Sequence, residues 1–391
     1  MYPLKPSMST ATTSSTLTSS EITKTNSTTS PIIEKNGSLQ IFLGGSCNPT
    51  TWRQNLAIPF LDTHGISYYN PQVENWSPEI IEIERRAKQN AQILLFVIDK
   101  QTRSTVSLVE SAFMAGENKN LVLVVNPYED RGCPIEDCGT ATSHKEFLEL
   151  KHARYLLQCL VARRKIPMFT DILNALYFIS RSLRNEPEDT RSLFEPNRQL
   201  NSEGSREELA DANSVEAVKD DIVVTPTHST LHTPNIDHNL TRDVYIYLDE
   251  CDHDLIETST LTALNQKGLT FSTKLVGDIT KNAIGDEIYN IKDRRVLLFV
   301  ITGQQRGLSL MVLASHMMSL FKDDVVLCVQ YLEEPCCVGG EVLTKTAVAD
   351  YNRGRVYLCD YAVKYQVPVF NTLQKAMDCC VQKCIGYNKV T

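Results

Sequence analysis

The pentapeptide LLFVI occurs twice in this chain, as residues 94–98 and again as residues 297–301, 203 positions further on. An apolar run of this length between polar residues is typical of a buried strand. The flanking pattern repeats as well, because residues 119–125 correspond to 323–329 and residues 166–169 to 367–370. A repeat of roughly 150 residues has the size of a domain and exceeds a solenoid unit, so the sequence predicts a duplicated domain.

Strand and helix signals alternate through the first copy. Apolar strands connected by helices are typical of a parallel sheet covered on both faces, so we expect an α/β fold. Ligands of such sheets bind beyond the carboxyl ends of the strands. The expected strands are 39–43, 66–69, 92–98, 121–126 and 168–169, and the expected helices are 52–61, 78–90, 105–116, 144–163 and 171–183.

Polar stretches flank the two copies. Residues 1–37 are rich in Ser and Thr, and residues 185–240 are rich in Glu, Asp, Asn and Ser. Such segments bury too little apolar surface to offset the entropy lost on ordering, so we expect a disordered tail and a disordered linker. This division places the first copy at 38–184 and the second at 241–391.

Two Thr-Pro dipeptides, at Thr225 and Thr233, lie in the predicted linker. They suit proline-directed kinases, and a phosphate there would add charge to a flexible segment. Such dipeptides also arise by chance in polar linkers, so both interpretations stay open at this point.

The composition excludes several classes of protein. The formal net charge is −8 with no basic cluster, which argues against nucleic acid as a primary partner. No apolar run approaches the ~20 residues that span a bilayer, and the polar N-terminus lacks a signal-peptide core. We therefore expect an intracellular protein, cytoplasmic with the nucleus as a second compartment, whose 12 cysteines are reduced thiols.

Eight of the 12 cysteines lie in the second copy. No Cys-x-x-Cys pair or nearby His completes the spacing of a usual zinc site. Most of them alternate with apolar residues and are better interpreted as small core side chains. We therefore expect neither a metal nor a cofactor.

Polar residues follow the predicted strands of the first copy. The loop after the first strand reads GGSCN at 44–48. Glycines there let the backbone approach a ligand, and amides at the start of the next helix favour an anion. With the residues after the later strands, the pattern predicts a ligand site made of Gly44, Gly45, Ser46, Asn48, Trp52, Arg53, Asn70 and Asp99.

Four of these residues also have a purely structural interpretation. The glycine pair can serve a tight strand-to-helix turn. Trp52 taken alone fits core packing better than a platform for a base, and Arg53 taken alone fits a surface or paired arginine better than a phosphate clamp. The combination with Asn48 and Asn70 favours the functional interpretation.

Glu110 is the candidate reactive group. It shares a helix face with Val106 and Phe113, so we expect its carboxylate to be at least partly desolvated. Burying it unpaired would cost several kcal/mol. Either it has a structural partner, for which Arg53 and Arg103 are candidates, or it faces a functional cleft. The position 203 residues later is Leu313, which indicates that the fold itself does not need a carboxylate here. Glu84, in contrast, maps to Glu287.

The motif LGGSCN at 43–48 followed by Trp52-Arg53, then Tyr69-Asn70-Pro71, then Glu110 after the third strand, resembles the nucleoside 2-deoxyribosyltransferase-like family. The resemblance covers most of the first copy and mainly the strands of the second. It implies flavodoxin-like domains in tandem, with Glu110 at the position of the nucleophile that attacks the sugar anomeric carbon. Glu84 falls where an acidic residue assists sugar binding or base departure.

The chain departs from the family pattern at two places. The aspartate expected six residues before the nucleophile is Ser104, so a proton donor for the departing base is missing. In the second copy Leu248-Asp249-Glu250 replaces the glycine loop, Ile256-Glu257 replaces Trp52-Arg53, and Leu313 replaces Glu110. We expect that copy to be catalytically inactive and to bind no nucleoside.

Three hypotheses follow. The first is a regulatory or interaction protein, similar to the Raw-type negative regulators of stress-kinase (JNK) signalling, with protein partners and a nucleoside- or nucleotide-like ligand. The second is an active N-glycoside hydrolase or transferase in the first copy, with Glu110 as nucleophile. The third is a structural role for Glu110 as a buried, paired carboxylate. The resemblance also implies that the two copies pack on each other, because family enzymes share sites between subunits.

Overall fold

The computed structural model describes residues 32–33, 39–72, 78–117, 119–128, 135–137, 140–185, 243–249, 252, 264–275 and 296–387. Thr225, Thr233, Glu250, Ile256, Glu257 and Glu287 lie outside this set, as does nearly all of the predicted tail and linker. Within the predicted tail, Ile32–Ile33 form strand β1. Two β-branched side chains suit an edge strand, and their backbone pairs with the edge of the first sheet.

The first sheet has a parallel core of five strands. These are β2 (Ile41–Gly45), β3 (Tyr68–Tyr69), β4 (Ile93–Ile98), β5 (Leu121–Val125) and β8 (Met168–Phe169). Their order is β3-β2-β4-β5-β8, and β1 adds antiparallel to β3. Written by position along the chain, the parallel core reads 2-1-3-4-5, which is the flavodoxin-like order.

The second sheet repeats that order. It consists of β9 (Val244–Leu248), β10 (Phe271–Leu275), β11 (Val296–Ile301), β12 (Val325–Val329) and β15 (Val369–Phe370), arranged β10-β9-β11-β12-β15 with all pairs parallel. The repeated LLFVI segments are the central strands β4 and β11. The predicted fold class, two flavodoxin-like α/β domains in tandem, is confirmed.

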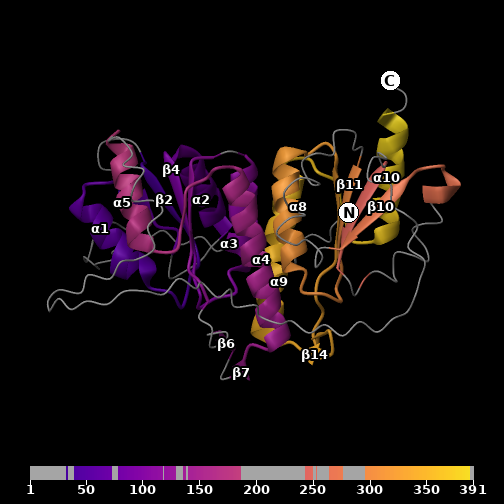
Figure 1. Ribbon diagram of the computed structural model, residues 1–391, viewed down its shortest axis with the longest axis horizontal. Helices are drawn as coiled ribbons and strands as arrows, with labels where there is room; N and C mark the ends of the chain where they lie inside the picture. The colour runs from indigo at the N-terminus through magenta and orange to yellow at the C-terminus, as the bar shows by residue number, and fades with distance from the viewer. Residues whose placement is uncertain are drawn as a thin grey trace, which may run out of the picture.

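Helices cover both faces of the sheets (Figure 1). In the first domain they are α1 (Ile58–Thr63), α2 (Pro78–Asn90), α3 (Thr105–Gly116), α4 (His144–Arg163) and α5 (Ile172–Leu183), with a π-helical turn η1 (Arg53–Ala57) before α1. In the second domain they are α8 (Leu308–Leu320), α9 (Lys345–Lys364) and α10 (Leu373–Tyr387). Two short hairpins, β6 (Glu136–Asp137) with β7 (Thr140–Ala141) and β13 (Cys337–Val338) with β14 (Glu341–Val342), precede α4 and α9. Within the described residues, no helix is long and apolar enough to cross a membrane.

Strand register corrects one alignment made from the sequence. Ile41 pairs with Ile93 in the first sheet, and Val244 pairs with Val296 in the second. Counting from these pairs, the glycine loop corresponds to Tyr247-Leu248-Asp249 rather than to Leu248-Asp249-Glu250. The one-residue error arose because the loops differ in sequence, whereas the strands before them share a regular pattern.

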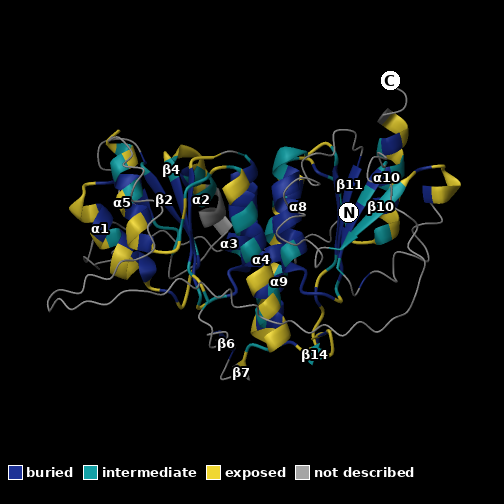
Figure 2. Ribbon diagram, viewed as in Figure 1, coloured by how far each residue is buried: buried dark blue, intermediate teal, exposed yellow. Residues whose placement is uncertain are grey.

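Helices of the two domains pack against each other at the centre of the molecule (Figure 1). Helix α3 contacts α8 and α9, and α4 contacts α8. A single apolar cluster continues through both domains at this interface and includes Phe113, Leu313 and Met317. Nearly every residue of α3 and α8 is buried, as expected for helices that are apolar all round (Figure 2).

Close backbone approach accompanies this packing. The Ser315 hydroxyl donates to the Val109 carbonyl at 2.8 Å, and His316 Nδ1 lies 3.0 Å from the Ala112 carbonyl. A Cβ added to Gly116 would lie only 1.6 Å from Ser319 Oγ, so the small residue is needed at this crossing.

The polar contacts at one end of the interface are reciprocal. Arg103 contacts Asp350 of the second domain at 3.4 Å, and its equivalent Arg306 contacts Glu149 of the first domain at 2.8 Å. Asp350 and Glu149 occupy equivalent positions of α9 and α4.

The helix caps repeat this exchange. Ser143 and Thr344 cap α4 and α9 through their hydroxyl oxygens, and each hydroxyl also binds a carboxylate in the hairpin of the other domain, Glu341 and Asp137 respectively. Contacts that recur with the partners exchanged define an isologous, two-fold-like interface inside one chain.

The outer faces of the sheets carry separate apolar clusters. That of the second domain contains Cys328, Cys380 and Cys384 among valines and leucines, fully buried as small core side chains. Cys337 is an exception to the burial expected for the cysteines of the second copy, since it is exposed.

Candidate functional site

The loop after β2 is held by Arg53. This side chain is completely buried and donates to the backbone carbonyls of Leu43, Gly45 and Ser46 at 3.0, 3.2 and 2.7 Å. Its guanidinium also lies 4.3 Å from the Trp52 ring, and Trp52 Nε1 donates to the Ser46 carbonyl. Burial lowers the pKa of Arg53, although an arginine remains charged at neutral pH. Arg53 therefore shapes the loop. Trp52 is part of the core, which agrees with its structural interpretation.

The glycine pair is required by packing. Gly45 has φ +106°, and a Cβ there would lie 2.2 Å from the Val97 carbonyl oxygen. A Cβ on Gly44 would lie 2.6 Å from the Phe96 ring. In the second domain, Tyr247 occupies the position of Gly44, and its ring stacks on Phe299 at 4.7 Å, the equivalent of Phe96. Tight packing thus explains the glycines without a ligand.

A chain of hydroxyl groups lies beneath this loop. Ser46 Oγ is 2.8 Å from Ser104 Oγ and accepts from the Asp99 amide at 3.0 Å. Thr102 Oγ1 binds both Asp99 Oδ1 and Ser104 Oγ, at 2.9 Å each. Ser46, Asp99 and Ser104 are all buried. These residues therefore form one hydrogen-bonded group at the carboxyl end of β4.

Ser104 stands in a left-handed backbone conformation with φ +55° at the start of α3. Its equivalent in the second domain is Gly307, with φ +68°. A non-glycine residue in this conformation is strained. The turn before α3 therefore carries a side chain at the position of the absent family aspartate, at an energetic cost that the second domain avoids.

Glu110 is buried, 7% exposed, and carries an ion pair. Lys88 Nζ from α2 lies 2.6 Å from Glu110 Oε1. The hydroxyl of Tyr361, from α9 of the second domain, donates to the same oxygen at 3.3 Å. The expectation that Arg53 or Arg103 pairs with Glu110 is wrong. Arg53 is committed to the loop, and Arg103 binds Asp137 and Glu146 at 2.6 Å each.

Glu84 lies beside this ion pair. Its Oε2 is 3.9 Å from Nζ of Lys88, and Lys88 follows Glu84 by one turn of α2. Burial raises the pKa of Glu84, and the charge of Glu110 raises it further, whereas Lys88 and Arg53 act in the opposite direction. Burial and the charge of Glu84 also raise the pKa of Tyr69 to about 12. The two candidate carboxylates therefore share one ammonium group.

The second domain contributes tyrosines to this cluster. Tyr361 stacks on Phe113 with ring centroids 4.3 Å apart. Tyr357, one turn earlier in α9, has its pKa raised by burial and by the charges of Glu110 and Glu84. We use the name carboxylate cluster for Glu84, Lys88, Glu110, Tyr357 and Tyr361. It draws on α2, α3 and α9 and so combines both domains.

Asn48 and Asn70 belong to a different polar group. Both contact Gln72. Its side-chain amide donates to Asn48 Oδ1, and its backbone N–H donates to Asn70 Oδ1 at 3.0 Å. This group is exposed or half-buried at the rim of the first domain. The predicted residues thus fall into four groups. These are the glycine loop with Arg53, the hydroxyl chain, the rim asparagines, and Glu84 with Glu110. The first two groups share Ser46, whose carbonyl accepts from Arg53 and whose hydroxyl contacts Ser104.

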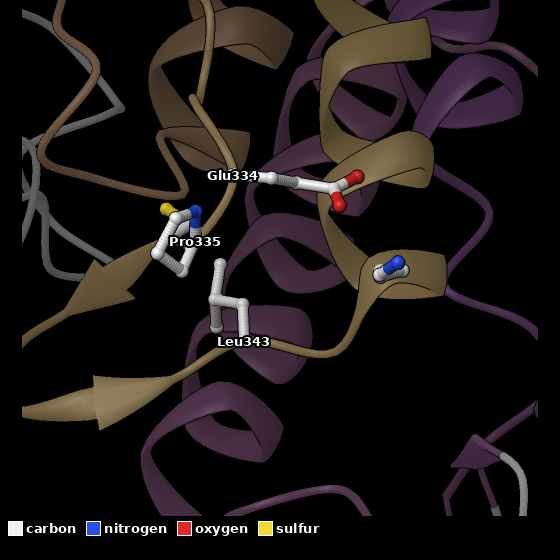
Figure 3. A pocket seen from close by; sticks show the side chains of 5 residues that line it. Glu334, Pro335 and Leu343 are labelled. Atoms are coloured by element: carbon white, nitrogen blue, oxygen red, sulfur yellow. The ribbon is translucent and has the colours of Figure 1, made fainter.

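A hollow of about 380 Å³ lies elsewhere, beside the β13–β14 hairpin of the second domain. It is lined by Glu334, Pro335, Cys336, Leu343 and Lys345, and Leu343 and Pro335 point into it (Figure 3). All five lining residues come from the second domain, so this hollow is distinct from the carboxylate cluster.

Comparison with known families finds a similarity within the first domain. Residues 38–128 match the family described as nucleoside 2-deoxyribosyltransferase like. The match contains the glycine loop, Glu84, Lys88 and Glu110, and it ends before α4. No curated protein matches the chain.

Lys88, Tyr357 and Tyr361 were missed by reasoning from the sequence. Lys88 is four residues after Glu84 on a helix, and that spacing signals an ion pair. Its contact with Glu110, 22 residues away, depends on how α2 packs against α3. Tyr357 and Tyr361 lie 247 and 251 residues from Glu110, so nothing local in the sequence connects them with it.

Proposed function

We propose that the chain is a regulatory or interaction protein whose nucleoside 2-deoxyribosyltransferase-like domain binds an N-glycoside of the nucleoside or nucleotide class without turning it over. The observation that carries this proposal is the state of Glu110. The Oε1 atom already accepts from Lys88 at 2.6 Å and from Tyr361 at 3.3 Å. A carboxylate engaged by an ammonium is a weaker nucleophile than one held free for attack.

Loss of the proton donor points the same way. A departing base needs an acid whose pKa lies near the working pH, and a serine hydroxyl does not meet that condition. The Ser104 hydroxyl is also occupied, since it binds Ser46 and Thr102. With no acid at position 104, the retained carboxylates support ligand binding better than base release.

The second domain acts, in this proposal, as a partner supplied within the same chain. Its α9 brings Tyr357 and Tyr361 to the carboxylate cluster, and its own equivalent of Glu110 is Leu313. We propose domains at 38–184 and 241–391 that work as one unit with one ligand site per chain, joined by 185–240.

The resemblance to Raw-type proteins adds the proposal of a role in stress-kinase (JNK) signalling, with protein partners and with the cytoplasm and nucleus as compartments. The test of that role is whether expression of the chain lowers JNK phosphorylation in stressed cells. If a Glu110→Gln chain of normal abundance no longer lowers JNK phosphorylation, signalling depends on the ligand site.

Ligand binding is tested on the full chain with nucleosides, nucleoside monophosphates and NAD-like N-glycosides. We expect one class of these compounds to bind with 1:1 stoichiometry in calorimetry and to raise the melting temperature. A ligand at ~100 times its dissociation constant adds about 2.7 kcal/mol of stability. Chromatography of the same mixtures should detect no base release above the uncatalysed rate.

The matched variants are Glu110→Gln and Glu117→Gln. Both carboxylates accept from a tyrosine of the second domain, since Tyr365, which follows α9 directly, donates to Glu117 at 2.7 Å. Glu117 lies outside the carboxylate cluster. Glu110→Gln should weaken binding and Glu117→Gln should not. Steady base release abolished by Glu110→Gln would instead establish the enzyme, and absence of any binding would leave Glu110 a structural residue.

A further inference from the structure

Lys88 binds the carboxylate that a ligand of the carboxylate cluster would contact. Its ammonium lies 2.6 Å from Glu110 Oε1, 3.9 Å from Glu84 Oε2 and 5.2 Å from the centre of the Phe42 ring. The side chain is only 14% exposed. The ammonium is thus held between two carboxylates and an aromatic face. The family resemblance assigns roles to the two carboxylates but none to Lys88.

A neutral ligand meets an unfavourable exchange there. To hydrogen-bond Glu110 Oε1, a sugar hydroxyl has to displace Lys88 from a buried ion pair, and a neutral sugar offers no charge to receive the ammonium. Leaving a charge buried and unpaired is strongly unfavourable. A ligand that carries a phosphate avoids this loss, because the phosphate can bind the displaced ammonium while the sugar contacts the carboxylate.

Lys88 is the cation best suited to make this exchange. The buried guanidinium of Arg53 is fixed by three carbonyl oxygens and has no freedom to follow a ligand. Lysine carries its point charge on a flexible four-carbon stem, and it can redirect its hydrogen bonds as the stem turns. The partial exposure of Lys88 gives the stem a route towards solvent, where a phosphate would remain hydrated.

We propose that Lys88 determines ligand specificity by making the carboxylate cluster select N-glycosides that carry a phosphate over the corresponding neutral nucleosides. The inference rests on the proposed function and deepens it, because it names a nucleotide as the ligand class and one side chain as the selecting group.

The experiment compares pairs of ligands on the full chain. Each pair is a nucleoside and its 5′-, 3′- or 2′-monophosphate, and the readout is the ratio of their dissociation constants by calorimetry. In the wild type we expect at least one monophosphate to bind about tenfold more tightly or better, equivalent to about 1.4 kcal/mol. In Lys88→Met that ratio should fall towards one, and the affinity for the neutral nucleoside should rise because Glu110 becomes free to accept from a sugar hydroxyl.

Lys151→Met is the matched control. Lys151 also lies over a phenylalanine, 5.5 Å from the centre of the Phe147 ring, but it is exposed on α4. This variant should keep the wild-type ratio. A global effect of lost positive charge would change both variants alike and would overturn the proposal.

Two further variants guard against misfolding of Lys88→Met. Lys88→Arg keeps the charge and should keep the preference for phosphate, whereas Lys88→Met combined with Glu110→Gln removes both charges of the ion pair and should lose the preference. If a folded chain without the Lys88 charge keeps the wild-type ratio of dissociation constants, the specificity role of Lys88 is rejected, whereas the proposed ligand binding is not. Binding of neither ligand to the wild type rejects the proposed function, and the specificity role falls with it.

Discussion

The two sides of the central helix interface differ in chemistry although they share one backbone plan. On one side Glu110 of α3 faces Tyr361 of α9, with Tyr357 close by. On the other side, the equivalent of Glu110 is Leu313 of α8, and the equivalents of Tyr357 and Tyr361 in α4 are Leu156 and Leu160. All three leucines are buried in the apolar cluster that joins the domains. A duplicated interface can therefore keep its packing with or without a buried carboxylate.

The two domains also differ at the residue that precedes the equivalent helices α3 and α8. Ser104 and Gly307 both adopt positive φ at the start of an equivalent helix, but only Ser104 connects to a hydrogen-bonded group. Backbone geometry is common to the two domains, and each of them buries hydrogen-bonded polar side chains. In the second domain Asp252 accepts from Thr302 at 3.0 Å and from Gln305 at 2.6 Å. What the second domain does not repeat is Ser104 and Glu110, whose equivalents are Gly307 and Leu313.

The largest effect is expected from making the apolar side resemble the polar one. Leu313→Glu would bury a carboxylate in the apolar cluster, where the described neighbours include Leu156 and Leu160. We expect a loss on the order of 5 kcal/mol in the free energy of unfolding, the upper end for an uncompensated buried charge. Urea titration followed by circular dichroism measures it. Leu313→Met, which keeps volume and polarity, should cost less than about 1.5 kcal/mol. Similar losses for the two variants would show that shape rather than charge controls this position.

The second effect separates the equivalent arginines. Arg103 is 3% exposed and binds the buried carboxylates Asp137 and Glu146 as well as Asp350. Arg306 binds Glu149 and Glu341, whose side chains are 39% and 27% exposed. We expect Arg103→Met to cost about 3–4 kcal/mol, because it leaves buried carboxylates unpaired, and Arg306→Met to cost about 1 kcal/mol. Chemical denaturation of both variants provides the comparison, and equal costs would contradict this difference in burial.

The third effect concerns pH. His316 is fully buried in α8 at the position equivalent to Phe113 in α3, and burial lowers its pKa from 6.5 to about 4. Below pH 6.5 the unfolded chain binds a proton that the folded chain refuses, so stability is present above pH 6.5 and is lost as the pH falls towards 4. The shift corresponds to a loss of about 3 kcal/mol.

The control is His316→Gln, whose side chain can still donate to the Ala112 carbonyl but does not titrate. Melting curves at pH 7.5 and pH 4.5 should show a smaller loss of stability in this variant than in the wild type. An identical loss would assign the acid sensitivity to other groups.

The sequence was a good guide to the fold because its signals are local. The LLFVI segments became the central strands, and α3 and α4 span the residues that the apolar periodicity indicated. The exceptions have local causes too. The expected strand 66–69 forms sheet pairs only at Tyr68–Tyr69, and the expected helix 52–61 begins as a π-helical turn and continues to Thr63.

The candidate site was predicted less completely. The burial of Glu110 followed from its apolar helix faces, and the proximity of Glu84 followed from the family resemblance. The partner of Glu110 did not, because Arg53 and Arg103 are consumed by contacts that depend on tertiary packing. Tyr361 could not be anticipated at all, since its approach results from how two domains dock rather than from any pattern near either residue.

The smallest effect tests that cross-domain contact. Tyr361→Phe removes only the hydroxyl that donates to Glu110 at 3.3 Å, and Tyr365→Phe removes the one that donates to Glu117 at 2.7 Å. Each hydrogen bond contributes about 0.5–1.5 kcal/mol, so both variants should lower stability slightly and the shorter bond should matter at least as much. Ligand affinity should respond differently, because only Tyr361 belongs to the carboxylate cluster. We expect calorimetry to detect weaker binding in Tyr361→Phe and wild-type binding in Tyr365→Phe. If both variants bind equally well, the second domain stabilises the first without taking part in its site, and the polar side of the interface differs from the apolar side in packing alone.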